Sequence, residues 1–565
     1  MSRTRQSLVG VIVTAVVLFA TAATAVAETC TLKPKRRETK SATFVDQASY
    51  LYWTVRPQYH FMQMIADGNG KWREAGSSDA SDAFKRIVTK EPKYVSDHPY
   101  RGVIKVGTEE FAFALDAVPP PDAKKPEKKT GEKTAEKTAE KPAKKTSSLV
   151  AAISGAIVEA TTPGSAATAG NPPPDPALIK DFAYNRLYCD FNHNGDLTDD
   201  KVIEITTDSR PAVMSMPAGM AYRPFAFPRI DLAIDVDGTK LDHSFFVNGY
   251  VNSSARHCTV MVSFSSATCR EGDITLEGKQ HHLVLIDFNS NGRFDDKIKI
   301  PENVRMASGQ LYAELGDVLL IDPPPGRTAG DSPYDPTGSD YRHFLSDLIQ
   351  IDGRWYDLKV SPTGDQLTLT HSTVPLGNVT NRNDSFGALI YSGEKGFLKI
   401  RGTKDKPVSV PEGEWKLYSY SITKKTPKAT DKPKAADNKT AEANPNTESL
   451  LAGLAGSLGV STGTPFPRPS LVSATATEKY NPVTVRKGET VEMPFGPPYT
   501  PTVTVAPYGA PNEQAAQTYL EMTLIGVGGE AVTNMTVKGS RPGKPEFRIT
   551  DPEGKVVQQG SFEYG

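Results

Sequence analysis

The chain has 565 residues, of which 65 are Lys or Arg and 66 are Asp or Glu, so its formal net charge is −1. This balance argues against a dedicated nucleic-acid-binding protein, because such a protein needs a basic surface. Only the first stretch of the chain is apolar for long enough to span a bilayer, which excludes a multi-pass membrane protein.

The N-terminus has the three parts of a secretory signal peptide. Arg3 and Arg5 form the positive region, residues 8–20 are apolar, and the Ala-Val-Ala run at 25–27 is a small-residue cleavage site. We expect cleavage after Ala27. The mature chain would then be secreted, periplasmic or at the cell surface, without a transmembrane segment. The alternative is an uncleaved membrane anchor.

Export permits disulfide bonds, and four cysteines allow three pairings. Cys258 and Cys269 flank a run that is typical of a strand followed by a turn, so one bridge between them is expected. The second bridge would join Cys30 to Cys189, and unpaired thiols are the alternative. The chain contains no CxxC motif, which argues against thiol-redox chemistry and a cysteine-ligated zinc site.

Two segments, 118–178 and 424–466, are rich in Lys, Ala, Thr, Pro and Glu and contain almost no large apolar side chains. They cannot bury enough surface to offset the loss of chain entropy, so they are predicted to be disordered linkers. Between and around them the sequence predicts four modules. These are an N-terminal β module at 28–117, a second module at 179–345, a third at 346–423 and a C-terminal β-sandwich at 467–565.

Outside the linkers apolar residues mostly alternate with polar ones, which predicts an all-β protein of sandwiches or open barrels. Three similar strand–turn–strand units, at 103–115, 274–286 and 349–360, have their turns at Gly107, Gly278 and Gly353. We interpret them as a degenerate repeat of one β module. The best short helix candidate is 80–88.

Two loops within 179–345 share the pattern D-F-N-x-N-G and an Asp-Asp-Lys ending. Their candidate metal ligands are Asp190, Asn192, Asn194, Asp196, Asp199 and Asp200 in the first loop, and Asp287, Asn289, Asn291, Arg293, Asp295 and Asp296 in the second. A calcium loop needs oxygen ligands at positions 1, 3 and 5 and a glycine at position 6. Asp196 and Arg293 would contribute backbone carbonyls, and one aspartate of each closing pair would complete the shell.

These loops resemble the calcium loops of EF-hand-like extracellular modules, including dockerins and thrombospondin type 3 repeats. The resemblance implies a structural calcium ion of weak affinity. Both loops depart from the EF-hand pattern, because position 12 of the first is Lys201 and both lead into strands. The second loop also has one residue fewer between its glycine and its Asp pair. The alternative is a pair of Asx-rich turns that hold no metal.

The chain contains no HExxH or P-loop motif and no GxGxxG motif preceding a helix, so no enzyme is predicted. As a whole it resembles the secreted, β-rich bacterial proteins of uncharacterised activity that carry D-x-N-x-N-G loops. The leading hypothesis is a structural or adhesive protein at the cell surface, with a surface polymer or another surface protein as partner. The alternatives are a carbohydrate- or wall-binding protein, which predicts exposed aromatic residues in a line, and a hydrolase with an unrecognised site.

Overall fold

The computed structural model describes most of the chain. The described residues are 27–37, 55–66, 72–74, 79–118, 184–205, 221–253, 257–301, 306, 309–324, 339–424, 470–508 and 517–564. The predicted signal peptide, except Ala27, and the bulk of both predicted linkers lie outside these residues.

The predicted all-β class is confirmed, because the described residues form 32 strands and one helix. That helix, α1 (Asp79–Ile87), lies where the sequence predicts it. No helix among the described residues has the length and apolar character needed to cross a membrane.

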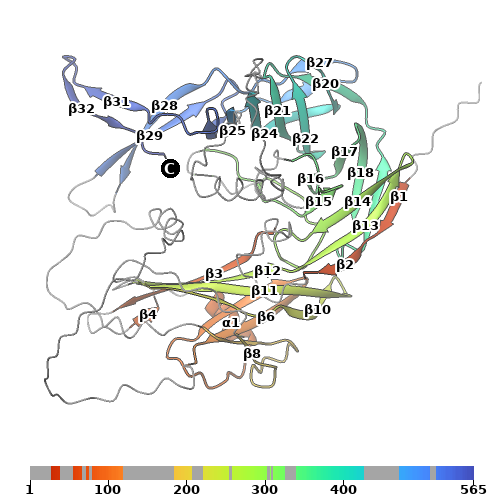
Figure 1. The fold of residues 1–565 in the computed structure, drawn as a ribbon, viewed down its shortest axis with the longest axis vertical. Coiled ribbons are helices and arrows are strands. Elements are labelled where there is room, and N and C mark those ends of the chain that lie inside the picture. The colour runs from red at the N-terminus through yellow and green to blue at the C-terminus, as the bar shows by residue number, and fades with distance from the viewer. Residues whose placement is uncertain are drawn as a thin grey trace, which may run out of the picture.

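Two sheets form one end of the molecule (Figure 1). The first has the order β10-β11-β12-β3-β4, with β9 also paired to β11, and the second has the order β5-β6-β7-β8. Their strands are β3 (Gln58–Ala66), β4 (Trp72–Glu74), β9 (Ala221–Ala226), β10 (Ile230–Val236), β11 (Thr239–Ser253), β12 (His257–Ser266), β5 (Tyr100–Val106), β6 (Glu109–Asp116), β7 (Arg186–Cys189) and β8 (Ile203–Glu204). Phe113 of β6 contacts His60 of β3 and Phe264 of β12, so the two sheets pack face to face.

Two more sheets continue from this end, in the orders β16-β15-β14-β13-β2 and β1-β19-β18-β17. Their strands are β1 (Ala27–Thr31), β2 (Lys33–Arg36), β13 (Thr268–Leu276), β14 (Lys279–Ile286), β15 (Val318–Ile321), β16 (Arg342–Phe344), β17 (Leu348–Ile351), β18 (Arg354–Val360) and β19 (Gln366–His371). One apolar core contains buried residues of all four sheets, for example Phe113, Val260, Leu283 and Leu369. Burying such side chains supplies most of the stabilisation of a β protein.

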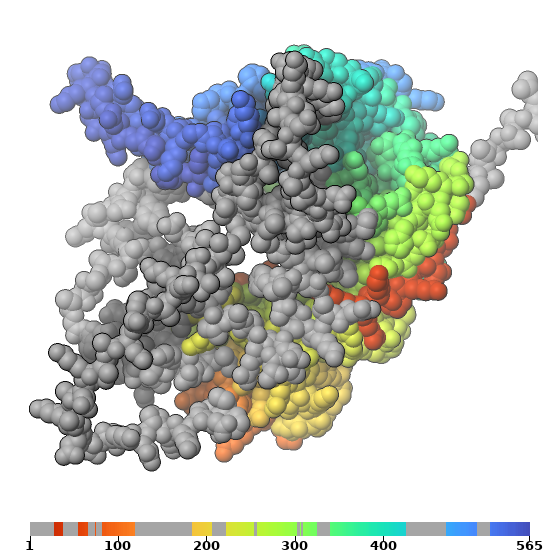
Figure 2. Space-filling view, viewed as in Figure 1, coloured from red at the N-terminus to blue at the C-terminus, as the bar shows by residue number. Residues whose placement is uncertain are grey.

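A second core lies under the C-terminal sheets and includes the fully buried Trp415. The long sheet has the order β22-β21-β24-β25-β30-β29-β28, β26 pairs with β24, and a small sheet has the order β23-β20-β27. The strands are β20 (Leu376–Thr380), β21 (Ser385–Ser392), β22 (Gly396–Thr403), β23 (Val408–Pro411), β24 (Gly413–Lys424), β25 (Ser470–Thr475), β26 (Val483–Val485), β27 (Thr490–Glu492), β28 (Thr500–Tyr508), β29 (Gln517–Ile525) and β30 (Ala531–Thr536). The last hairpin, β31 (Glu546–Thr550) with β32 (Val556–Ser561), is the deep-blue projection in Figure 2.

The three predicted hairpins are present as β5–β6, β13–β14 and β17–β18. A fourth, β10–β11, turns at Asp237 and Gly238, and the sequence pattern did not predict it. Asp237 and Gly238 have φ values of 52° and 84°, and the residues of the Glu277–Gly278 and Asp352–Gly353 turns have similar values. Two successive left-handed residues make a type I′ turn, whose twist matches that of the flanking strands.

Strand pairing crosses the predicted module boundaries. Strand β1 pairs with β19, β2 pairs with β13, and β3 pairs with β12. The N-terminal segment therefore supplies strands to three sheets whose other strands come from residues 221–371. The sheets are shared between the predicted modules.

The predicted disulfides are not formed, because all four cysteines are free and buried. The expected hairpin between Cys258 and Cys269 is wrong. Strand β12 runs almost without interruption into β13, and these strands belong to different sheets. Cys258 lies at the far end of β12 opposite Met64, whereas Cys269 lies opposite Ile286. The two thiols are thus separated by nearly the whole length of β12.

Candidate metal centre

The two D-F-N-x-N-G loops have the same backbone conformation. His193 and Gly195 in the first loop have φ values of 58° and 77°, and Ser290 and Gly292 in the second have 60° and 80°. These left-handed residues turn the chain around the side chain of the first aspartate, a conformation that Asx turns favour. The sequence motif therefore specifies a local structure as well as a set of oxygen atoms.

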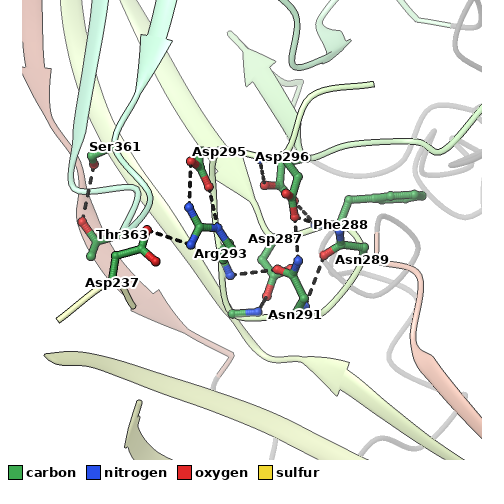
Figure 3. A network of polar contacts seen from close by, with 12 residues as sticks. Asp237, Asp287, Phe288, Asn289, Asn291, Arg293, Asp295, Asp296, Ser361 and Thr363 are labelled. Carbon is green, nitrogen blue, oxygen red and sulfur yellow. Dashed lines mark hydrogen bonds and ion pairs between the residues drawn. The ribbon is translucent and has the colours of Figure 1, made fainter. Parts of the chain in front are cut away.

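In the second loop the polar side chains converge (Figure 3). Asp287 follows β14 directly and is fully buried, and its carboxylate accepts the N–H groups of Asn291 and Gly292 at 3.0 and 2.9 Å. The amide groups of Asn289 and Asn291 both donate to Oδ2 of Asp296, at 2.9 and 2.7 Å. The side chains at positions 1, 3, 5 and 10 thus gather in one place.

The first loop repeats this arrangement. Asp190 accepts the N–H groups of Asn194 and Gly195 at 3.1 and 3.0 Å. Asn192 and Asn194 donate to the two oxygens of Asp199, at 3.4 and 2.7 Å. Asp199 is also position 10 of its loop, which makes it the counterpart of Asp296.

The closing aspartates are therefore Asp199 and Asp296, and the loops have equal length up to this position. The sequence comparison gave the second loop one residue fewer because it matched Asp199–Asp200 with Asp295–Asp296. In the structure Asp199 corresponds to Asp296. Asp295 occupies position 9, and its carboxylate binds the Arg293 guanidinium at 3.0 and 3.1 Å. Asp200 occupies position 11 and accepts the N–H of Phe191 at 3.2 Å.

The side chains at position 7 are directed away from both centres. Arg293 forms ion pairs with Asp295 and with Asp237 of the β10–β11 turn. Asp196 accepts a hydrogen bond from Lys90 at 2.7 Å, and this bond, with a smaller contribution from Thr198, lowers the pKa of Asp196 to about 2. Only the backbone of these two residues remains as a candidate ligand.

Asp317 is a residue of this site that the sequence motif did not reveal. It lies just before β15, is fully buried, and accepts the N–H groups of Phe288 and Asp296 at 3.0 and 2.9 Å. In the first loop the corresponding N–H, that of Phe191, is bound by Asp200. The only sequence signal is a single aspartate before an apolar run, 21 residues after Asp296.

The second centre contains two fully buried carboxyl groups, those of Asp287 and Asp317. Burial, together with the proximity of the other carboxylates, raises the pKa values of both Asp287 and Asp317. His243 lies 4.0 Å from Asp287, but burial lowers its pKa to about 3, so it is neutral and supplies no compensating charge at pH 7. In the first centre, burial raises the pKa of Asp200.

Each loop also joins separate parts of the fold. In the second loop, the carbonyl of Asn291 accepts the N–H of Gly107 in the β5–β6 turn at 2.6 Å. The N–H of Phe294 donates to Pro362, which follows β18, at 3.0 Å. In the first loop, the carbonyl of Gly195 accepts the N–H groups of Thr89 and Lys90, which follow α1.

Within the described residues, no group of three or more His, Cys, Asp or Glu side chains is close enough to hold a metal ion by itself. A cation in either loop would therefore depend on the asparagines and on backbone carbonyls. For this, each amide group would turn so that Oδ1 replaces Nδ2 at the centre. In the second loop the Oδ1 atoms of Asn289 and Asn291 accept the N–H groups of Asn291 and Arg293 at 3.2 and 2.9 Å, so this turn would exchange those backbone hydrogen bonds for bonds to the ion.

Comparison of the chain with protein-family models, with curated proteins and with solved structures finds no match.

Proposed function

We propose that the protein is an exported β scaffold whose two D-F-N-x-N-G loops each bind a calcium ion, and that it has a structural or adhesive role at the cell surface. Calcium prefers six to eight oxygen ligands from carboxylates, amides, carbonyls and water. In the second loop, the side chains of Asp287, Asn289, Asn291 and Asp296 would supply part of such a set once the two amide groups have turned. Water and the carbonyl of Arg293 would complete it.

The observation that carries the proposal is the position of these loops in the fold. The second loop contacts the β5–β6 turn through Gly107 and the chain after β18 through Pro362. A divalent ion bound by Asp287 and Asp296 would offset the repulsion between the carboxylates of this centre and fix the loop against both neighbours. The ion would therefore act as a staple between sheets, which suits a load-bearing or adhesive protein.

The expected stabilisation follows from linkage. Extracellular calcium modules bind with dissociation constants of about 10⁻⁴–10⁻³ M. At 10 mM calcium, each such site adds about 1.4–2.7 kcal/mol to the free energy of unfolding. We expect the melting temperature of the mature chain to rise with calcium and to fall again when EDTA is added.

Substitution of the closing aspartates tests which residues are responsible. Asp296→Asn and Asp199→Asn should each remove part of the calcium-dependent rise in melting temperature. Asp295→Asn is the matched control for Asp296→Asn. It removes the same charge from the preceding residue, whose carboxylate binds Arg293 and not the asparagines of the loop. An unchanged melting temperature at millimolar calcium, with no binding heat in calorimetry, would rule out the proposal.

A further inference from the structure

One face of the sheet that contains β9, β11, β12 and β3 carries three straight rows of side chains. Strand pairing places the members of each row directly opposite one another. The middle row is Pro224, Tyr250, Met261 and Phe61. The two flanking rows are Tyr222, Asn252, Thr259 and Gln63 on one side, and Ala226, Asn248, Ser263 and Tyr59 on the other. We call these twelve residues the aromatic face.

The aromatic face is the side of the sheet that points away from the core. Successive side chains of a strand alternate between the two faces. The intervening residues Val251, Val260 and Val262 are fully buried. They lie on the side that packs against β6, which Figure 1 shows next to α1. On the opposite side, Tyr59 and Phe61 remain 47% and 55% exposed.

Four aromatic rings of this face lie in two neighbouring pairs. The rings of Tyr59 and Phe61 stack with centroids 6.2 Å apart and planes 26° apart. At the other side of the sheet, the rings of Tyr222 and Tyr250 are 5.2 Å apart and 34° apart. With strands spaced by about 4.8 Å, the middle row extends roughly 14 Å across the sheet. This is longer than one sugar ring.

The chemistry of the face indicates the kind of partner. None of the twelve residues is Asp, Glu, Lys or Arg, so the face offers no charge to a polyanion, a nucleic acid or an anionic membrane. The flanking rows instead carry amide and hydroxyl groups, which both donate and accept hydrogen bonds. In the row with Tyr59, Ala226 and Ser263 are buried and the Ser263 hydroxyl donates to Asn248, which leaves the Asn248 amide nitrogen for a partner. An apolar, aromatic row between two such rows matches a pyranose chain, whose C–H faces are apolar and whose edges carry hydroxyl groups.

We propose that the aromatic face binds an extended, neutral, β-linked polysaccharide. The inference takes up the surface-polymer partner that the sequence left open, and it does not depend on calcium in the loops. It assigns contact with the sugar faces to Phe61, Tyr59 and Tyr250. The hydroxyl edges would bind Asn248 and Asn252.

The test is a binding assay of the mature chain with insoluble chitin and cellulose, with α-linked dextran as a comparison polymer. We expect the chain to sediment with at least one of the β-linked polymers, both in calcium and in EDTA. The double substitution Tyr59→Ala with Phe61→Ala should weaken this binding at least tenfold, because truncated aromatic anchors typically have effects of this size. Phe61→Tyr, which keeps the ring, should retain it.

The control variant combines Val503→Ser and Val505→Ser, which remove two exposed apolar side chains from β28 on another sheet. It should bind as the wild type does. The inference is overturned if the wild type binds neither β-linked polymer or if the Tyr59/Phe61 variant binds unchanged. It is also overturned if the aromatic face binds a second copy of the chain and not a sugar. In that case the wild type would bind no sugar but would self-associate in light scattering, and the Tyr59/Phe61 variant would not self-associate. A calcium-dependent melting temperature in the same samples would leave the scaffold proposal standing.

Discussion

Gly292 in the second metal loop offers a quantitative test of how tightly this loop is packed. Its φ value is 80°, and a Cβ atom at this position would lie 2.6 Å from Ile234 Cδ1 and 2.7 Å from Val106 Cγ1. It would also lie 2.9 Å from the backbone nitrogen of Gly107. Carbon atoms do not approach this closely without displacing their neighbours, and one of these neighbours is backbone.

The expected loss of stability in Gly292→Ala has two parts. A left-handed conformation costs an alanine about 1–2 kcal/mol, and overpacking of a filled site adds about 1–3 kcal/mol. Gly278 in the β13–β14 turn is the matched control, because its φ value is 79° and a Cβ atom there would have no neighbour within 4 Å. Gly278→Ala should therefore show only the first part.

The measurement is urea or thermal unfolding of both variants in EDTA, so that the difference reports packing and not metal binding. Gly292→Ala should be less stable than Gly278→Ala by about 1–3 kcal/mol. Each kcal/mol corresponds to roughly 2–4 °C in melting temperature for a folded unit of about 150–250 residues. Equal losses in the two variants would refute the conclusion that the second loop is clamped against β5, β10 and the Gly107 turn.

Two further predictions follow from buried titratable groups. His60 lies between the rings of Phe113 and Phe264, and burial lowers its pKa to about 4. Because the folded pKa is below the unfolded value of about 6.5, this contribution to stability is complete above pH 6.5 and is lost as the pH falls toward 4. The free energy of unfolding in urea should therefore be lower at pH 5 than at pH 7, and His60 should account for on the order of 1–2 kcal/mol of this difference. His60→Phe should reduce the difference. An unchanged difference would contradict the assignment. Burial also raises the pKa values of Cys258 and Cys269 to about 11 and about 12. A thiol reagent should therefore leave the native protein unlabelled and react with four thiols after denaturation, whereas fewer reactive thiols without a reductant would indicate disulfides.

The sequence by itself determined the local features of this protein. Alternating apolar residues predicted an all-β fold, and Glu277–Gly278 and Asp352–Gly353 predicted hairpins, because a turn is specified by the conformations that a few adjacent residues allow. The repeated D-F-N-x-N-G motif predicted which side chains gather in each loop for the same reason. Positions 1, 3 and 5 lie within one turn of the chain, so no distant segment is needed to bring them together.

Only the tertiary structure decided which residues from distant segments meet. It selected Asp296 over its neighbour Asp295 as the closing residue, because Arg293 holds Asp295. It brought Asp317 to the second loop, placed Cys258 and Cys269 in separate sheets, and aligned Phe61 with Met261 and Tyr250 across three strands. These contacts depend on strand pairing over long stretches of chain. Periodicity in the sequence gives the face on which a side chain lies but not the strand beside it.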